Sequence, residues 1–209
     1  ALSTDKAANP INLYGASKLA SDKIFVAANN LTGGNTFFSV VRYGNVIGSR
    51  GSVIELFKRL IEENNSFLPI TDPRMTRFWI SIEDGVEFVL SSISLMSGGE
   101  IFIPKIPSAK IIDVATAMAP KLEHRIIGIR AGEKLHETMI NIDDARNTLS
   151  LGNKYIIMPS IEGLSTSILT KMGAKKVEDG FTYQSDTNPE TLNVDKIKKT
   201  LDRYLNVVE

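Results

Sequence analysis

The spacing of apolar and polar positions along this chain predicts helices and strands in turn. Within residues 14–29, Leu19, Ile24 and Phe25 recur at helical spacing and are available for a core, which predicts a helix. Residues 36–45 are rich in β-branched and aromatic side chains, so they predict a buried strand of a parallel sheet. A helix followed by a buried strand favours an α/β fold.

The same reading predicts further elements along the rest of the chain. Strands are expected at 67–72, 100–104, 124–129 and 155–158. Helices are expected at 53–63, from Ser81 onward, at 111–118, around His136 and after Asn193. The polar segment after 151 is expected to be peripheral, as an oligomer contact.

Composition bounds the protein class. The 209 residues are 43% apolar and 23% charged, enough for one large domain or two small ones. Lys plus Arg equals Asp plus Glu at 24 each, without a basic block, so we expect neither nucleic acid nor a membrane as partner. The absence of Cys excludes a disulfide scaffold and thiolate catalysis. We expect a soluble, cytoplasmic protein, with no metal site because His124 and His136 lack ligand spacing.

Candidate chemistry begins with Tyr14 and Lys18, which lie four residues apart in the first predicted helix. Side chains at this spacing project from one face and can meet at one point. A neighbouring ammonium favours the phenolate form of a tyrosine, which lets a tyrosine act as a base near neutral pH. Because the same spacing also arises by chance on surface helices, this pair alone decides nothing.

Thr4, Asp5 and Lys6 come just before this helix, where the sequence reads as a strand end followed by a turn. Ligands of open α/β sheets bind at strand ends, so these side chains are expected in the same crevice as Tyr14. The alternative is that they are turn and capping residues, with Asp5 and Lys6 an ordinary ion pair.

Three later segments suggest contacts with an anion. The glycine-rich turn before Ser52 and Val53 opens a helix, which suits phosphate, although its glycines could simply supply positive φ. Arg77 lies between aromatic residues and could bind a diphosphate or be merely solvated. Arg130 could hold phosphate while Glu133 accepts from a sugar hydroxyl.

A dinucleotide-binding fold opens with a strand, a Gly-x-x-Gly-x-x-Gly turn and a helix, and the sequence has no such element. The chain also begins within the motif that leads to Tyr14. We therefore expect it to be the C-terminal part of a longer protein, with an N-terminal half of more than about a hundred residues missing.

The motifs taken together resemble one enzyme family. STDKA, YGASKLASDK, VRYGNVIGSRGSV, PITDPRMTRFW and GIRAGEKLHE occur in this order. The chain is similar to the inverting UDP-N-acetylglucosamine 4,6-dehydratases of the extended short-chain dehydrogenase/reductase superfamily, closely over 1–142. The resemblance implies the C-terminal part of a Rossmann-like doubly wound parallel sheet plus a smaller α/β substrate-binding domain. It places an NADP-binding remainder at 1–48, a UDP-sugar-binding domain at 49–150, with parts of the sheet interleaved, and a C-terminal extension at 151–209.

The resemblance also implies roles for individual residues. Tyr14 would take the proton from the sugar 4-hydroxyl while Thr4 bonds the same oxygen, and Asp5 and Lys6 would be the acid and base of water elimination. Contacts with NADP and with UDP-N-acetylglucosamine are implied for the following residues: Tyr14, Lys18 and Tyr43 for the cofactor, and Asn45, Ser52, Val53, Thr71, Arg77, Arg130 and Glu133 for the substrate. A homo-oligomer, commonly a hexamer, acting on the route to pseudaminic acid and flagellin glycosylation is implied as well.

Two other functions stay open. A UDP-sugar 4-epimerase or a retaining 4,6-dehydratase would share Tyr14 and Lys18, but would have no use for a lysine at position 6. Because the cofactor turn is missing, these residues alone could also be a non-catalytic nucleotide-sugar-binding module.

Overall fold

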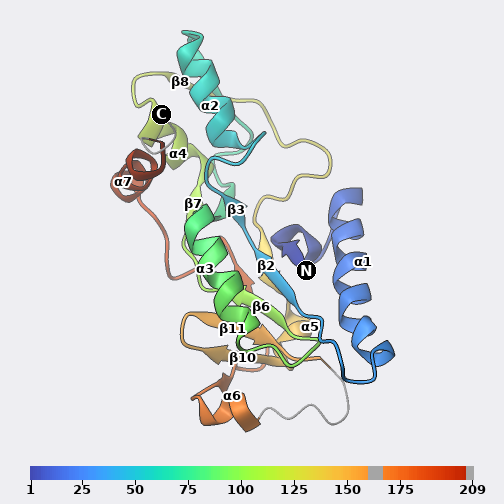
Figure 1. Cartoon of the computed structure of the whole chain (residues 1–209). Coiled ribbons are helices and arrows are strands. Elements are labelled where there is room, and N and C mark those ends of the chain that lie inside the picture. The colour runs from blue at the N-terminus through green and yellow to red at the C-terminus, as the bar shows by residue number, and fades with distance from the viewer. Residues whose placement is uncertain (160–166, 206–209) are drawn as a thin grey trace. The chain divides into compact units, whose positions relative to one another are not determined.

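The computed structural model describes residues 1–159 and 167–205 (Figure 1). The chain divides into two compact units, each built from three separate segments. Unit 1 comprises Ala1–Tyr43, Asp84–Lys105 and Thr138–Gln184, and unit 2 comprises Gly44–Glu83, Ile106–Glu137 and Ser185–Glu209.

Unit 1 is built on a mixed sheet of six strands. Their spatial order is β1 (Leu2–Thr4), β2 (Val40–Tyr43), β6 (Ile101–Pro104), β11 (Lys154–Ile157), β10 (Thr148–Leu151) and β12 (Lys175–Lys176). The first three strands run parallel, and the other three pair antiparallel. The α/β class is confirmed, and the antiparallel half shows that the sheet is parallel only where β1, β2 and β6 pair.

Helices and short strands complete unit 1. They are η1 (Asp5–Ala7), α1 (Leu13–Ala28), η2 (Asn29–Leu31), most of α3 (Ile82–Ile93), α5 (Ile142–Ala145), α6 (Ser167–Lys171) and the pair β9 (Thr138–Ile140) and β13 (Tyr183–Gln184). Val41, Phe88, Phe102 and Ile156 form the centre of its core. This core joins α3 to the sheet, so it fixes the strands whose ends carry the candidate residues.

Unit 2 holds smaller sheets and three main helices. The strands form β3 (Asn45–Val46), β5 (Thr76–Ile80) and β7 (Ser108–Lys110) in one sheet, and β4 (Phe67–Ile70) and β8 (Glu123–Ile126) in another. The helices are α2 (Val53–Glu62), α4 (Ile111–Met118) and α7 (Val194–Leu205).

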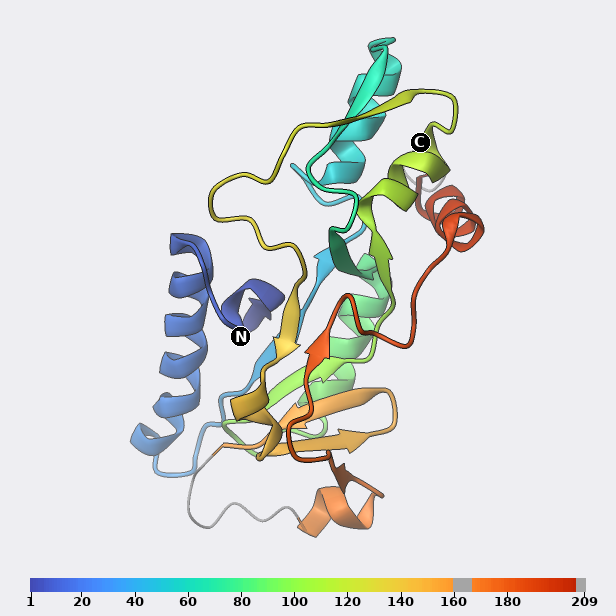
Figure 2. The same cartoon turned by 180° about the vertical axis from the view of Figure 1, so that it is seen from behind.

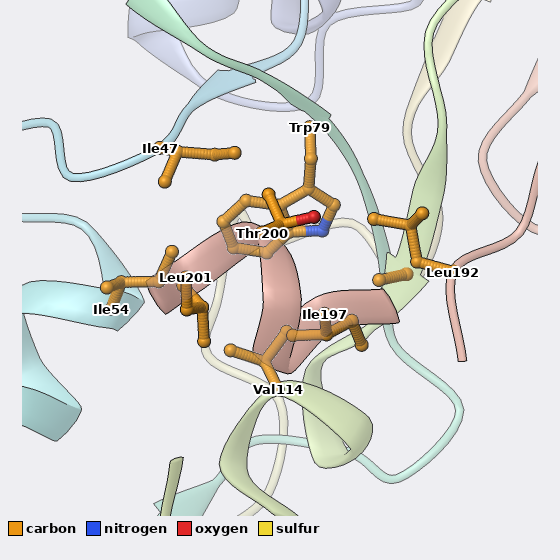
Figure 3. Close-up of a pocket in the computed structure, with 9 residues that line it drawn as sticks. Ile47, Ile54, Trp79, Val114, Leu192, Ile197, Thr200 and Leu201 are labelled. Carbon is orange, nitrogen blue, oxygen red and sulfur yellow. The ribbon is translucent and has the colours of Figure 1, made fainter. Parts of the chain in front are cut away.

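The unit 2 core gathers around Trp79, and part of it is contributed by α7. Ile197 and Leu201 of α7 are 4% and 5% exposed, and they pack in one cluster with Ile54, Trp79 and Val114. Figure 3 shows a small apolar pocket among these side chains, with residues of α7 on one side of the indole ring. Segments of 151–209 thus belong to both units, because β11 lies inside the sheet and α7 covers this cluster.

Most expected helices and strands are present within a few residues of their predicted bounds. The helix expected around His136 is wrong, because residues 131–137 form turns and bends. Gly132 there has φ of 82°. The carbonyls of Lys134 and Leu135 accept from the Arg77 side chain, so they bond outside their own segment. Within the described ranges, no helix is long and apolar enough to span a bilayer.

Candidate active site

Asp5 and Lys6 lie at the carboxyl end of β1, as the sequence predicts. Thr4 ends the strand and caps η1, with its hydroxyl accepting from Lys6 N at 3.4 Å and donating to Asp5 Oδ1 at 2.9 Å. Lys6 Nζ donates to the same Oδ1 at 3.0 Å. Asp5 is fully buried, and Oδ2 has no hydrogen-bond partner among the described residues. The Lys6 ammonium therefore faces a carboxylate whose Oδ1 accepts two hydrogen bonds, while its Oδ2 accepts none from the described residues.

Tyr14 and Lys18 are both carried by α1, whose start is fixed by a cap. The Asn12 side chain accepts from Gly15 N at 2.8 Å, which is the contact that begins this helix. Tyr14 is 55% exposed. Lys18 Nζ donates to the Leu2 carbonyl of β1 at 2.8 Å. An ammonium has three donors, and within the described residues Lys18 uses one of them for this bond.

Tyr43 lies beside Thr4, because the two residues are register partners in the parallel pair of β1 and β2. Burial raises the pKa of its phenol, and the nearby Tyr14 phenol raises the pKa further. Thr4, Asp5, Lys6 and Tyr43 therefore lie at the strand tips of β1 and β2, and helix α1, which carries Tyr14, contacts η1.

The residues expected to contact substrate lie in unit 2, and the first of them follow β2 closely. Asn45 opens β3 opposite Trp79, and its Oδ1 is buried with no partner in the part of the chain described. Ser52 caps α2, with its hydroxyl accepting from Glu55 N at 3.4 Å. Val53 packs on the unit 2 core. Gly48 and Gly51 have φ of 70° and 73°, so the turn does need its glycines for backbone geometry.

Thr71 follows β4 and precedes Asp72, whose carboxylate is hydrogen-bonded to Arg74. Asp72 accepts from the backbone and guanidinium of Arg74, with Arg74 Nη2 at 2.8 Å from Oδ2. These hydrogen bonds lower the pKa of Asp72 to about 2. The turn after β4 is thereby fixed, and Thr71 is half-buried on it.

Arg77 is buried and already holds a loop. Its Nη1 donates to the Thr76 carbonyl at 2.7 Å and the Leu135 carbonyl at 3.2 Å, and Nη2 donates to the Lys134 carbonyl at 2.9 Å. Its Nε lies 3.7 Å from Glu137 Oε1. Arg77 therefore anchors residues 134–137, and in the part of the chain that the structure describes one N–H of Nη2 is left for a further acceptor.

Arg130 and Glu133 lie close together on the turn that precedes this anchored segment. Arg130 Nη1 is 3.8 Å from Glu133 Oε1, and Glu133 N donates to the Arg130 carbonyl at 3.1 Å. The Arg130 side chain is 65% exposed. The structure brings these two residues together, with the cation open to solvent.

A partly buried polar network next to Arg77 is not evident from the sequence. Thr76 Oγ1 lies 2.8 Å from His136 Nδ1 and 2.7 Å from Ser185 Oγ, which accepts from Glu137 N at 2.9 Å. His136 Nε2 is 4.0 Å from Asp186 Oδ2. The sequence offers little signal of it, because His136 and Ser185 lie 60 and 109 positions from Thr76 along the chain.

A protein-family model described as "Polysaccharide biosynthesis protein" matches residues 1–159. A curated relative from Campylobacter jejuni, named UDP-N-acetylglucosamine 4,6-dehydratase (inverting), is 63% identical over 196 residues. That match covers 90% of this chain, which spans 58% of the relative.

Two solved structures resemble this chain to different degrees. The X-ray structure of Pen from Bacillus thuringiensis matches with a TM-score of 0.85 at 30% sequence identity. This match covers 98% of this chain and 62% of the Pen chain. The dTDP-glucose 4,6-dehydratase of Bacillus anthracis, solved with NAD, has a TM-score of 0.55 at 17% identity. The latter match covers 63% of this chain and 49% of its own, and supports the fold alone.

Proposed function

We propose that this protein acts as a nucleotide-sugar dehydratase. The chain belongs to the polysaccharide biosynthesis protein family, which is the starting point of this proposal. The reaction would remove water from UDP-N-acetylglucosamine with oxidation at C4 and inversion at C5, giving a UDP-2-acetamido-2,6-dideoxy-hexos-4-ulose. The observation that carries this proposal is the contact of 3.0 Å between Lys6 Nζ and the buried Asp5 carboxylate. The 63% identity to a relative named for this reaction supports it.

The cofactor of the proposal is NADP, which would accept a hydride from sugar C4 and return it to C6. Lys18 would bind the nicotinamide ribose through its two remaining N–H groups, with Tyr14 and Tyr43 beside it.

Tyr14 would remove the proton of the 4-hydroxyl as the hydride leaves C4, and Thr4 would hold the same oxygen. Elimination then needs a neutral amine to take the C5 proton and a carboxylic acid to protonate the departing 6-hydroxyl. A single proton moving from Lys6 Nζ to Asp5 Oδ1 along their contact produces both forms without changing the net charge. Water leaves, and a proton returns to the opposite face of C5 as the hydride reaches C6.

Unit 2 would bind the nucleotide. Arg130 and the remaining N–H of Arg77 would bind the diphosphate, and Glu133 would accept from the ribose. The remaining substrate contacts are assigned to Asn45, Ser52, Val53 and Thr71. We also propose a homo-oligomer, a hexamer, that works in the cytoplasm on the route to pseudaminic acid, as the family resemblance implies.

Mass spectrometry of the product tests the reaction. The protein, expressed with whatever residues flank this sequence in its gene, is incubated with UDP-N-acetylglucosamine and NADP. Loss of one water is expected, and NMR of the product gives the C5 configuration. An unchanged mass with a new C4 configuration would indicate a 4-epimerase, and binding without turnover would indicate a non-catalytic module.

Lys6→Ala tests the role of the base. In deuterium oxide, the wild type is expected to place solvent deuterium at C5, and the variant to lose this exchange by about 100-fold or more while still binding NADP. Lys23→Ala, which removes an exposed lysine of α1, is the control and should exchange normally. Undiminished exchange in Lys6→Ala would remove Lys6 from the mechanism.

A further inference from the structure

Helix α1, which carries Tyr14 and Lys18, makes polar contacts with the unit 1 sheet. Its buried residues are Gly15 and Asp22, and neither provides a large apolar side chain. Ile24, which the sequence assigned to the core, is 66% exposed, while Phe25 is 36% exposed and its ring centroid lies 6.0 Å from that of Phe38. The position of α1 therefore depends in part on the polar contacts of its inner face.

Asp22 lies on that inner face, below the proposed catalytic pair. Tyr14, Lys18 and Asp22 follow one another at intervals of four residues, so they line one side of the helix. Along this side, Lys18 Nζ bonds the Leu2 carbonyl of β1 at 2.8 Å. Asp22 Oδ2 accepts from Arg42 Nη2 of β2 at 3.1 Å. These two contacts hold the helix against the two strands whose tips carry the chemistry.

Arg42 is buried as well, and it holds more than α1. Its side chain is 3% exposed, and Nη1 donates to the Met139 carbonyl of β9 at 2.8 Å. The same nitrogen lies 4.0 Å from Asp144 Oδ2 in α5. Strand β9 in turn contacts η1, the segment of Asp5 and Lys6. One guanidinium thus contacts both α1 and β9 from its place on β2. Figures 1 and 2 show the backbones of α1 and β2 side by side.

We propose that the buried ion pair of Asp22 and Arg42 positions Tyr14 for the reaction. The pair fixes the height and rotation of α1 on the sheet, so that the phenol faces the strand tip where Asp5 and Lys6 lie. Asp22 and Arg42 are positioning residues, because they act through α1 and β9 and do not touch the substrate. The inference rests on the proposed function, since it takes Tyr14 as the base.

Loss of the Asp22 charge leaves the buried Arg42 with Asp144, 4.0 Å away, as its counter-charge on α5, so the attraction that holds α1 is lost and a shift of the helix is favoured. Reacting groups displaced by about 1 Å lose about 100-fold in rate. The residues assigned to the nucleotide belong to unit 2, so substrate affinity should change little. A large fall in kcat at constant KM is therefore the signature of the proposed role.

Asp22→Asn tests this in the complete enzyme with cofactor, because it keeps the side-chain size and removes the charge. We expect kcat to fall about 10- to 100-fold while KM for the UDP-sugar stays within about twofold. The deuterium isotope effect on kcat with 4-deuterated substrate should rise, because proton and hydride removal at C4 become slower. Arg42→Lys, which keeps a cation but not the planar fork, should show the same pattern.

Asp143→Asn is the matched control, because Asp143 pairs with Arg146 at 3.7 Å on the exposed surface and should leave kcat unchanged. Unchanged kcat in Asp22→Asn would overturn the proposal. So would parallel losses of kcat, NADP binding and cooperative unfolding, which indicate a merely structural pair. If Asp22→Asn does not fold, Arg42→Lys decides by the same criteria.

The proposed dehydratase function can be refuted independently of the positioning role of Asp22 and Arg42. If the wild type converts the UDP-sugar without losing water, the dehydratase assignment fails, and the kcat and KM comparison is made on the observed reaction. If the wild type turns over no nucleotide sugar, both proposals are rejected.

Discussion

Asp5 shows how burial can prepare a single side chain for proton transfer. One of its oxygens receives both the Thr4 hydroxyl and the Lys6 ammonium, while the other is buried and lacks a partner among the residues described. A bare buried carboxylate oxygen costs free energy unless something later satisfies it. The departing hydroxyl of a substrate would be such a group, whereas a plain turn ion pair would leave this oxygen unsatisfied.

Tyr43 gives a pH prediction at the same scale. Its pKa is raised in the folded protein, first by burial and then by Tyr14, so the folded state holds this proton more tightly than the unfolded state. The stabilisation is fully present below about pH 10, the pKa of an unperturbed phenol, and is lost as pH rises through the folded pKa. Urea denaturation between pH 8 and 11 should show a shallower alkaline loss of stability for Tyr43→Phe, and parallel curves would contradict this.

Individual residues differ in how far the sequence predicted them. The spacing of Tyr14 and Lys18 predicted a shared helix face, since both belong to one regular element. The burial of Arg77 could not be predicted, because its acceptors on Lys134 and Leu135 lie 57 and 58 positions along the chain. Arg42 gave a signal that was missed: an arginine within an otherwise apolar strand implies a buried partner.

At the scale of elements, the close contact between α1 and η1 sets where Tyr14 stands relative to the Lys6 backbone. A Cβ on Gly15 would collide with the Lys6 carbonyl oxygen and lie 3.0 Å from Pro10 Cβ. Only a residue without a side chain lets the first turn of α1 approach η1 this closely. Glycine here serves packing, since its φ is ordinary for a helix.

Gly15→Ala is expected to push α1 away from η1. Activity should fall by about 10-fold or more from misplacement, while the free energy of unfolding falls by about 1–3 kcal/mol. Steady-state kinetics and urea denaturation measure the two effects. Ala16→Gly, at an exposed position of the same turn, costs about 1 kcal/mol by helix propensity and should keep its activity. Equal activity in both variants would show that the contact is dispensable.

Long periodic elements were predictable, and short ones were not. The spacing of apolar residues predicted α2 and α4 almost to the residue, since each has a buried stripe. Strands β9 and β13 have three and two residues, too few for a period to show. Their pairing depends on Tyr183 meeting Ile140 across a long stretch of chain, which only the folded structure supplies.

At the scale of the whole molecule, the chain passes repeatedly between its two units. The crossings fall at 43–44, 83–84, 105–106, 137–138 and 184–185. The ranges expected from the sequence, 1–48, 49–150 and 151–209, follow chain order and allow for parts of the sheet being interleaved, but they do not give these crossing points. Each unit depends on segments that are far apart in sequence.

Truncation after Gln184 tests this dependence. It removes α7, whose Ile197 and Leu201 are buried, and it removes Ser185, which accepts from Glu137 N. Deleting even one such apolar side chain costs about 2–5 kcal/mol, so unit 2 should lose its fold and bind an apolar dye. Dye fluorescence and gel filtration measure this. Truncation after Leu205 is the control, and a compact, dye-free protein ending at Gln184 would refute the prediction.

The late position of α7 has a consequence for biosynthesis. A ribosome releases Trp79 and Val114 well before residues 194–205 emerge, so the growing polypeptide displays an apolar surface whose cover has not yet been translated. The nascent chain should therefore bind chaperones that shield apolar segments, until α7 is translated and packs over the indole of Trp79.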